Sequence, residues 1–294
     1  MELPLTPAAF NCSLLSKKTT LGFRRTGRIG SYDSPTKIEP TASGVPLSRT
    51  ICVANQKGGV GKTTTAINLA TGLALAENKT LLVDMDPQCN ATSGVGQKPV
   101  QRHPLIKRDP ISESTLQTRI ENLKLLPGSR AFVDVDRLAK ADDSQADQVI
   151  QHLEHASDQY DFIVFDCPPS IGKLTQTALA SSTEVLMPIQ CEYFAMEGLT
   201  QMIEVIRDVM RAKSGSLEFG GIVLTMFEES LELTEEVEEQ VREFFGEIVF
   251  DTVIPRDVAV SESPSYGCSV IEYSPRSKGS RAYIELCMEV LERD

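Results

Sequence analysis

The chain alternates short apolar runs with longer segments in which apolar residues recur every three or four positions. Short apolar runs predict buried strands, and the longer periodic segments predict amphipathic helices. The predicted strands are 50–54, 80–84, 123–127, 162–166, 185–189, 221–226 and 249–254. The predicted helices are 62–77, 143–156, 175–180, 196–212, 234–245 and 279–292. This alternation predicts an α/β fold: a doubly wound, mostly parallel sheet with helices on both faces.

Two polar stretches interrupt the alternation. Residues 95–120 carry three prolines, and we expect them to form an excursion on the surface. Residues 1–49 are basic and rich in Ser, Thr, Pro and Gly, so we expect a disordered tail or a misassigned start of the chain. Two alternatives stay open for this segment: an organellar transit peptide, as for a plastid, and a basic arm that contacts DNA or a partner. Residues 50–294 are then a single domain.

Charge is distributed unevenly along the chain. Residues 1–50 carry seven Lys or Arg against three Asp or Glu, whereas the remaining residues carry 22 against 38. An acidic body argues against a nucleic-acid interface that covers the whole domain. No apolar run approaches the ~20 residues of a membrane-spanning helix, and none of the seven cysteines forms a C-x-x-C pair. We therefore expect a cytoplasmic protein with reduced cysteines and neither a zinc site nor a disulfide framework.

A glycine-rich segment follows the first predicted strand. Residues 55–65 read Asn-Gln-Lys-Gly-Gly-Val-Gly-Lys-Thr-Thr-Thr, which fits the phosphate-binding template G-x-x-x-x-G-K-[ST] when its first position is relaxed. Glycines let the backbone point its N–H groups at phosphate oxygens, and the following helix adds a partial positive charge. Lys62 then reaches the β- and γ-phosphates, and the Thr63 hydroxyl ligates Mg²⁺. The residues predicted to bind ATP are Gly58, Gly59, Val60, Gly61, Lys62, Thr63 and Thr64.

A second lysine, Lys57, lies near the start of the same loop. The template requires only one loop lysine. The additional one suggests a further anionic contact, for instance with a nucleotide that another subunit holds.

Acidic residues end two of the predicted strands. The second strand runs into Asp-Met-Asp-Pro-Gln (84–88), and the fourth ends at Asp166, followed by Cys-Pro-Pro-Ser (167–170). Right-handed crossovers place the carboxyl ends of parallel strands at one edge of the sheet, so these acids should meet the glycine-rich loop there. Asp84 and Asp86 are suited to orient Mg²⁺ or an attacking water, and Asp166 is suited to hold Mg²⁺. The two prolines make a stiff bend that is placed to sense the γ-phosphate.

Three other polar groups favour structural interpretations. Gln190 and Glu192 follow the fifth predicted strand, and their spacing favours loop polar groups over a base-binding pocket. The glutamates of helix 234–245 are expected on a solvated face above an apolar stripe. His152 and His155 lie three positions apart without partner ligands, so we expect no metal site there.

Several of these segments occur together in one order: Lys-Gly-Gly-Val-Gly-Lys-Thr-Thr (57–64), Asp-Met-Asp-Pro-Gln (84–88) and Phe-Asp-Cys-Pro-Pro-Ser (165–170). Together they resemble the deviant Walker-A ATPases, and within them most closely the ParA/Soj partition group. The likeness runs from residue 50 to near the end of the chain, and its further segments are 90–94, 188–199, 253–256 and 261–265.

The resemblance implies an ATP-hydrolysing dimerisation switch with a P-loop NTPase fold. Two subunits would close on two ATP molecules, with Lys57 reaching the partner's phosphates and Gly58 keeping the facing backbones close. Lys62 would serve the phosphates of its own subunit. Asp86 matches the family's acid that positions the attacking water, and Asp166 matches the acid of the metal site.

The resemblance also implies an adenine pocket and partners. Pro255 and Asp257 match positions that border adenine in this superfamily. In the family the ATP-bound homodimer binds DNA without sequence specificity and is nucleoid-associated. A ParB-type partner then triggers hydrolysis and release, which moves a chromosome, plasmid or other cargo.

The chain departs from the family pattern at two positions associated with DNA binding. Ala259 and Ser230 stand where the family often has arginine, and Glu228 and Glu229 lie just before Ser230. Losing two phosphate contacts weakens non-specific DNA binding, because each contact contributes to counterion release. Compensation is open to the basic tail and to other cations: Arg256, Arg276, Lys278 and Arg281.

Two alternative functions keep the same fold. One is a cargo-positioning or assembly ATPase that does not use DNA as its track, which the departures at Ser230 and Ala259 favour. The other is a membrane-associated ATPase resembling MinD, a group that ends in a basic amphipathic helix. Here the last residues are Glu-Arg-Asp (292–294), and anionic lipid repels an acidic terminus, so we expect no membrane association. The cysteine spacing also fits no iron–sulfur cluster.

Overall fold

The computed structural model describes residues 48–107, 110–131, 159–193, 195–212 and 217–293. The predicted tail falls almost entirely outside these residues, and so does the predicted helix 143–156 with its two histidines. These expectations, and the single-domain boundary that depends on the tail, stay predictions.

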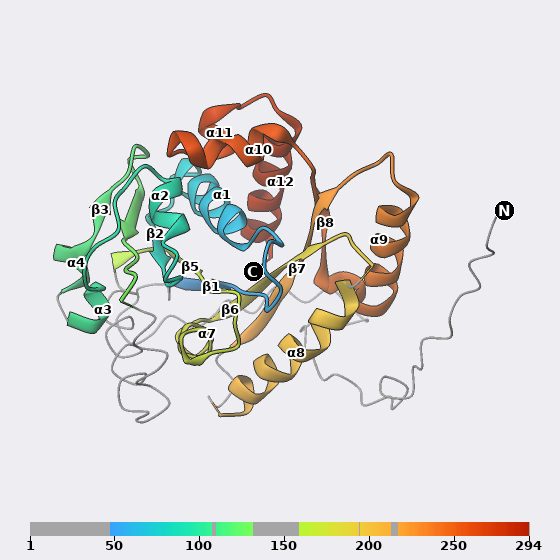
Figure 1. Ribbon diagram of the computed structural model, residues 1–294, viewed down its shortest axis with the longest axis horizontal. Coiled ribbons are helices and arrows are strands. Elements are labelled where there is room, and N and C mark those ends of the chain that lie inside the picture. Colours follow the sequence, from blue (N-terminus) through green and yellow to red (C-terminus); the bar gives the residue numbers. More distant parts are fainter. Residues whose placement is uncertain (1–47, 108–109, 132–158, 194, 213–216, 294) are drawn as a thin grey trace, which may run out of the picture. The chain divides into compact units, whose positions relative to one another are not determined.

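The described strands form one eight-stranded sheet in the order β3-β4-β2-β5-β1-β6-β7-β8 (Figure 1). The strands are β1 (Arg49–Val53), β2 (Thr80–Asp84), β3 (Leu116–Gln117), β4 (Leu123–Leu126), β5 (Phe162–Asp166), β6 (Glu184–Gln190), β7 (Glu218–Phe227) and β8 (Val249–Pro255). Every neighbouring pair is parallel except β3 with β4. The predicted mostly parallel sheet is confirmed.

Helices cover both faces of this sheet (Figure 1). The described α-helices are α1 (Lys62–Leu75), α2 (Asn90–Gly94), α3 (Pro104–Lys107), α4 (Ile111–Ser114), α7 (Lys173–Ala180), α8 (Ala195–Ala212), α9 (Glu232–Phe245), α10 (Val258–Glu262), α11 (Val270–Tyr273) and α12 (Lys278–Glu292). Short 3₁₀ helices span Gly246–Ile248 and Ser263–Tyr266. None of the helices in the described part is long and apolar enough to span a bilayer.

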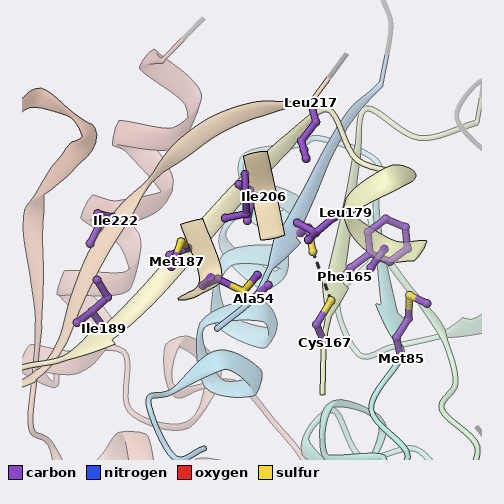
Figure 2. Packing of buried hydrophobic residues seen from close by; sticks show 14 of the residues in the cluster. Ala54, Met85, Phe165, Cys167, Leu179, Met187, Ile189, Ile206, Leu217 and Ile222 are labelled. Carbon is purple, nitrogen blue, oxygen red and sulfur yellow. Dashed lines mark hydrogen bonds between the residues drawn. The ribbon is translucent and has the colours of Figure 1, made fainter. Parts of the chain in front are cut away.

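Two hydrophobic layers flank the sheet because successive strand residues point to opposite faces. In β5, Ile163 and Phe165 pack in one layer with residues of α7, α8 and α9. Phe162 and Val164 pack in the other layer with residues of α1 and α12. Figure 2 shows part of the first layer. A strand buried on both faces reads as a continuous apolar run, which is why the run ending at Asp166 predicted β5 correctly.

The segment 95–120 is more ordered than predicted. α3 begins at Pro104, and Pro110 is the residue just before α4. These positions suit proline, because the first N–H groups of a helix have no partner within it. His103 and Leu105 are buried. Most other described residues of the segment are at least partly exposed, except Val95, Pro104 and Ile111, so the predicted surface excursion is wrong only at these buried positions.

The sheet order brings the carboxyl ends of β2, β5 and β1 next to one another. Asp84, the last residue of β2, pairs with Asp166, the last residue of β5. Asp166 also pairs with Val53, the last residue of β1. The glycine-rich loop that follows β1 and the acids that end β2 and β5 consequently share one edge of the sheet, as predicted.

Candidate nucleotide-binding site

The loop between β1 and α1 adopts a conformation that favours glycine at two positions. Gly59 and Gly61 have φ of +77° and +88°, in the left-handed region where a side chain causes strain. Thr225 of β7 donates its hydroxyl to the Val60 carbonyl at 2.9 Å, which ties the loop to the sheet. The predicted phosphate-binding residues 58–64 therefore lie together in a defined turn that leads into the N-terminus of α1.

Lys62 is the first residue of α1 and is buried. Its Nζ donates to the Lys57 carbonyl of the loop at 2.8 Å. Burial lowers the pKa of Lys62, and the carboxylates of Asp166 and Asp86 oppose that shift. The ammonium group therefore lies between the loop and the acids, where a phosphate oxygen is a stronger partner than a carbonyl.

Asp166 is fully buried, and neither of its carboxylate oxygens has a hydrogen-bond partner among the described residues. Burial raises the pKa of Asp166 well above its usual range, and the neighbouring Asp84 raises it further, whereas Thr63 and Lys62 lower it. An unpaired buried carboxylate is costly, and a bound cation relieves that cost. Asp166 and the Thr63 hydroxyl are oxygen donors of the kind that Mg²⁺ takes.

No group of three or more His, Cys, Asp or Glu side chains in the described part of the chain forms a complete metal site. Mg²⁺ usually binds through one or two carboxylates together with the phosphates of its nucleotide. The residues present therefore fit a cation that arrives with ATP better than one that the protein holds alone.

Asp84 is the last residue of β2, Asp86 lies two residues further on, and both are buried. Asp86 donates its backbone N–H to Oδ1 of Asp84 at 3.2 Å and accepts the Gln88 N–H at 2.8 Å. Burial raises the pKa of Asp84 to about 6, and hydrogen bonds from Thr92 work against that shift. Asp86 and Asp166 thus lie near Lys62, and Asp84 lies beside Asp166, so the acids gather at this edge as the parallel strands predicted.

Lys57 forms an ion pair with Glu192, the second residue after β6, with 2.8 Å between Nζ and Oε2. Gln190 donates its side-chain amide to the other oxygen of Glu192. The Lys57 and Glu192 side chains remain 33% and 47% exposed, so the pair contributes no more than about 1 kcal/mol. Glu192 lies in the loop after β6, as predicted, but its ion pair with Lys57 was not part of the prediction. The strand order, which puts β1 beside β6, is the information that the prediction lacked.

Pro255 and Asp257 lie at the end of β8, three strands from β1 in the sheet order, or roughly 14 Å at the usual strand spacing. The Asp257 carboxylate accepts the N–H of Ala259 at 2.9 Å and the N–H of Gly279 at 2.8 Å. Its side chain therefore caps α10 and holds the start of α12. The adenine-binding role of these two positions stays a prediction.

The two departures from the expected family pattern lie close after β7 and β8: Ser230 in the loop after β7, and Ala259 in the first turn of α10. The N–H of Arg256 donates to the Phe227 carbonyl at 2.8 Å, which holds the loops side by side. Ser230 is exposed and Ala259 is half-buried. Arg256, one of the cations expected to compensate, is 3.4 Å from a carboxylate oxygen of Glu228. Its charge is therefore partly offset before any DNA approaches.

Three residues around Asp84 were missed by the sequence reasoning: Thr92, His103 and Gly128. His103 accepts the Leu105 N–H at Nδ1, so the proton lies on Nε2, 3.2 Å from the Asp84 carbonyl oxygen. Burial lowers the pKa of His103 to about 3, which keeps the ring neutral. Thr92 belongs to the segment 90–94 that carries part of the resemblance, and that was the signal available.

Known proteins with similar sequences include ATPases of chromosome partitioning. An AAA domain family matches residues 48–219, which is more than half of the chain. The chromosome partitioning protein ParA of Myxococcus xanthus is 42% identical, over 84% of this chain and 89% of that protein. The sporulation initiation inhibitor protein Soj of Bacillus subtilis is 39% identical, over 83% of this chain and 98% of that protein.

Solved structures share the fold. Cobyrinic acid a,c-diamide synthase from Mycobacterium smegmatis with bound ADP and magnesium has a TM-score of 0.72 at 28% identity, over 83% of this chain and 94% of that one. The cell division ATPase MinD from Pyrococcus furiosus has a TM-score of 0.68 at 28% identity, over 83% of this chain and 99% of that one. Both structures share the fold of this chain, and the synthase was solved with bound ADP and magnesium.

Proposed function

We propose, from the premise that this chain belongs to the ParA/Soj family of partition ATPases, that it is an ATP-driven dimerisation switch that partitions or positions a chromosome, plasmid or other cargo. It converts ATP and water to ADP and phosphate and uses Mg²⁺. One observation carries the proposal: the phosphate loop holds two lysines in different settings. Lys62 is buried against the acids, and Lys57 is partly exposed at the surface. One lysine suffices for the phosphates of one subunit, so the exposed one is suited to a second nucleotide.

The roles of the site residues follow from their positions. Lys62 would leave the Lys57 carbonyl and bind the β- and γ-phosphates of its own ATP. Asp86 would accept a hydrogen bond from the attacking water and orient it toward the γ-phosphate. Thr63 and Asp166 would hold Mg²⁺, which neutralises charge on the phosphates when it is bound.

Dimer closure requires Lys57 to change partners. In the single chain its ammonium group faces Glu192, and in the closed dimer it would face the phosphates of the partner's ATP. Exchanging one anion for another keeps the charge compensated, and a half-exposed pair is easily broken. ATP would therefore favour the dimer, and loss of the γ-phosphate would return Lys57 to Glu192.

Gly58 supports a close approach between two copies. Its φ lies outside the left-handed region, and a Cβ placed there would meet no atom within 4 Å. Nothing among the described residues of one chain therefore requires glycine at this position. A second backbone packed against the loop would require it.

The finer part of the proposal concerns partners and location. A ParB-like activator would trigger hydrolysis, and the homodimer with ATP would be the form that binds the track. The exposed cations of α12, Lys278 and Arg281, lie in its first turn, whereas Glu285 and Glu292 are exposed in its C-terminal half, which disfavours an anionic membrane as that track. We assign the switch to the cytoplasm, nucleoid-associated if it binds DNA, with a plastid as the alternative if residues 1–49 are a transit peptide.

A second candidate function is a switch of the same family that does not use DNA as its track. The replacement of two family arginines by Ser230 and Ala259, and the ion pair of Arg256 with Glu228, favour it. Fewer available cations mean fewer phosphate contacts and a weaker, less salt-dependent association with DNA.

Retention on non-specific duplex DNA separates the two candidates. The protein is measured with ATP and with ADP over a salt series, and ATP hydrolysis is followed in parallel. Retention that requires ATP and falls with salt supports the DNA-borne switch. Hydrolysis without retention at the lowest salt supports the second candidate, and absence of hydrolysis contradicts both.

A further inference from the structure

A buried hydrogen-bond network surrounds Asp84, an acid to which the proposed function gives no task. Oδ2 of Asp84 accepts the Thr92 N–H at 2.7 Å and the Thr92 hydroxyl at 2.6 Å. Oδ1 accepts the Asp86 N–H at 3.2 Å. Neither Asp84 nor Thr92 has any exposed surface. One carboxylate therefore connects α2 to the backbone of the acid that is proposed to orient water.

The Thr92 hydroxyl has two partners and only one possible direction for its proton. It accepts the N–H of Gly128, which follows β4, at 2.8 Å. Because that N–H is a donor, the hydroxyl proton points to Asp84. A Cβ at Gly128 would lie 2.7 Å from Cγ of Asp84, so only glycine lets the backbone come this close. The network thus joins three separate segments of the chain at one side chain.

The position of Asp84 explains why its carboxylate needs to be held. Asp84 pairs with Asp166 across β2 and β5, so a small rotation about its side chain would turn it toward the proposed cation site. A second carboxylate there would add a ligand to the cation and would release the Asp86 backbone. The bonds from Thr92 hold the carboxylate on the side of α2 instead.

We propose that Thr92 is a positioning residue for ATP hydrolysis: its hydroxyl holds the Asp84 carboxylate, which fixes the Asp86 backbone and stays out of the cation site beside Asp166. The inference rests on the proposed function, because it assumes that Asp86 orients the attacking water. Thr92 itself contacts neither nucleotide nor water in this account.

The test compares variants of two buried threonines in the full chain. Thr92→Val keeps the shape and the backbone bond to Asp84 but removes the hydroxyl, and Thr92→Ser restores the hydroxyl. Thr71→Val is the matched control, since the Thr71 hydroxyl is buried without a hydrogen-bond partner among the described residues. We expect Thr92→Val to lower kcat roughly 10- to 100-fold with KM for ATP changed less than about threefold, because misplacing a reacting group by about 1 Å costs this much. Thr92→Ser and Thr71→Val should stay within about threefold of the unmodified chain.

A second readout distinguishes positioning from a purely structural role. Binding of Mn²⁺ alone, without nucleotide, is titrated by electron paramagnetic resonance. In Thr92→Val the Asp84 carboxylate loses the hydroxyl bond, the shortest of its three hydrogen bonds, and turns toward Asp166 more readily. Mn²⁺ therefore binds severalfold more tightly, and adding Asp84→Asn removes the gain. Thr92→Ala serves the same comparison if the valine variant does not fold.

Two outcomes overturn the inference. One is a kcat of Thr92→Val equal to that of the unmodified chain. The other is a loss of kcat with Mn²⁺ affinity unchanged, which would mean that the hydroxyl only supports the fold. Failure of the proposed function looks different: Asp86→Ala would then hydrolyse ATP at the unmodified rate, while the Mn²⁺ result for Thr92 would still hold.

Discussion

Two regions of the molecule lie along the same edge of the sheet and differ in how tightly they are constrained. The nucleotide region comprises Lys62, Asp84, Asp86 and Asp166 at the ends of β1, β2 and β5, and all four side chains are buried. The outer loops are residues 228–233 and 256–259, which follow β7 and β8 and include the first residues of α9 and α10, and much of their surface is exposed. In the nucleotide region, Lys62, Asp84 and Asp86 have hydrogen-bond partners within the chain, and Asp166 is suited to bind a cation. In the second, most side chains can change without disturbing the interior.

The difference in burial between the two regions indicates which substitutions the fold tolerates. A substitution in the nucleotide region leaves a buried charge unpaired, which is destabilising by several kcal/mol. A substitution in the outer loops costs little stability. This chain has the phosphate loop and its acids, yet Ser230 and Ala259 stand at the two positions where the resemblance leads us to expect arginine. Under the proposed function, buried residues therefore determine the use of ATP, and exposed residues determine whether DNA is the track.

The largest expected effect comes from Lys62 in the nucleotide region. Lys62→Ala should weaken ATP binding by about 100-fold or more, since it removes a charge-assisted contact to phosphate in a buried site. Lys57→Ala is the matched control on the same loop, and it should change ATP affinity by less than about fivefold. Titration with a fluorescent ATP analogue measures both. Unchanged affinity in Lys62→Ala would show the phosphate-loop assignment to be wrong.

The next effect concerns the buried surroundings of Asp84. The pKa of His103 is about 3 in the folded chain, below its usual value of 6.5, so the unfolded chain binds the proton more strongly. Stability from this group is present above pH 6.5 and falls by about 2 kcal/mol between pH 6.5 and pH 4.5. Urea denaturation across this range measures it, and His103→Gln should lack this part of the loss. The raised pKa of Asp84 increases stability as the pH falls, which is the opposite of the His103 effect. Because both chains contain Asp84, its contribution cancels when the unmodified chain is compared with His103→Gln. If the stability of His103→Gln depended on pH as strongly as that of the unmodified chain, His103 would not be the buried neutral group that causes the loss.

A smaller effect is expected from restoring charge to the outer loops. Ser230→Arg with Ala259→Arg should raise ATP-dependent DNA affinity about tenfold at low salt and steepen the logarithmic salt dependence by up to about two. Glutamine at both positions is the control for size without charge. DNA affinity equal in the arginine and glutamine variants would mean that these loops do not face the track.

The smallest effect is expected where the two regions meet, at the ion pair of Lys57 with Glu192. Glu192→Gln should lower the ATP concentration needed for half-maximal dimerisation about two- to fivefold, because Lys57 no longer leaves an ionic partner. Glu238→Gln breaks a comparable pair with Arg242 on α9 and serves as the control. Sedimentation at a series of ATP concentrations measures the shift. A Glu192→Gln chain that needs more ATP would reverse the proposed role of the pair.

The fold was largely predictable because its strands are buried on both faces. Such strands appear as apolar runs, and β2 and β5 have the predicted bounds. β3 was missed because two residues leave no pattern, and its antiparallel pairing with β4 depends on a distant segment. The short helices α10 and α11 were missed for a similar reason: Asp257 and Ser269 cap them, but too few turns follow to show periodicity.

The site was predictable where one short segment carries the chemistry. The glycine-rich loop and the strand-ending Asp166 each signal their chemistry locally. Thr92 and Glu192 do not, because their roles depend on partners outside their own segments: Asp84 for Thr92 and Lys57 for Glu192. Only the sheet order brings those pairs together.

The central claim is that ATP, held at this site, closes two copies of the chain. The most direct measurement is the molecular mass of Asp86→Ala by analytical ultracentrifugation with Mg²⁺ and either ATP or ADP. The account predicts a dimer with ATP that persists because turnover is blocked, and a monomer with ADP. A monomer in saturating ATP, or a dimer that forms equally with ADP, would contradict it.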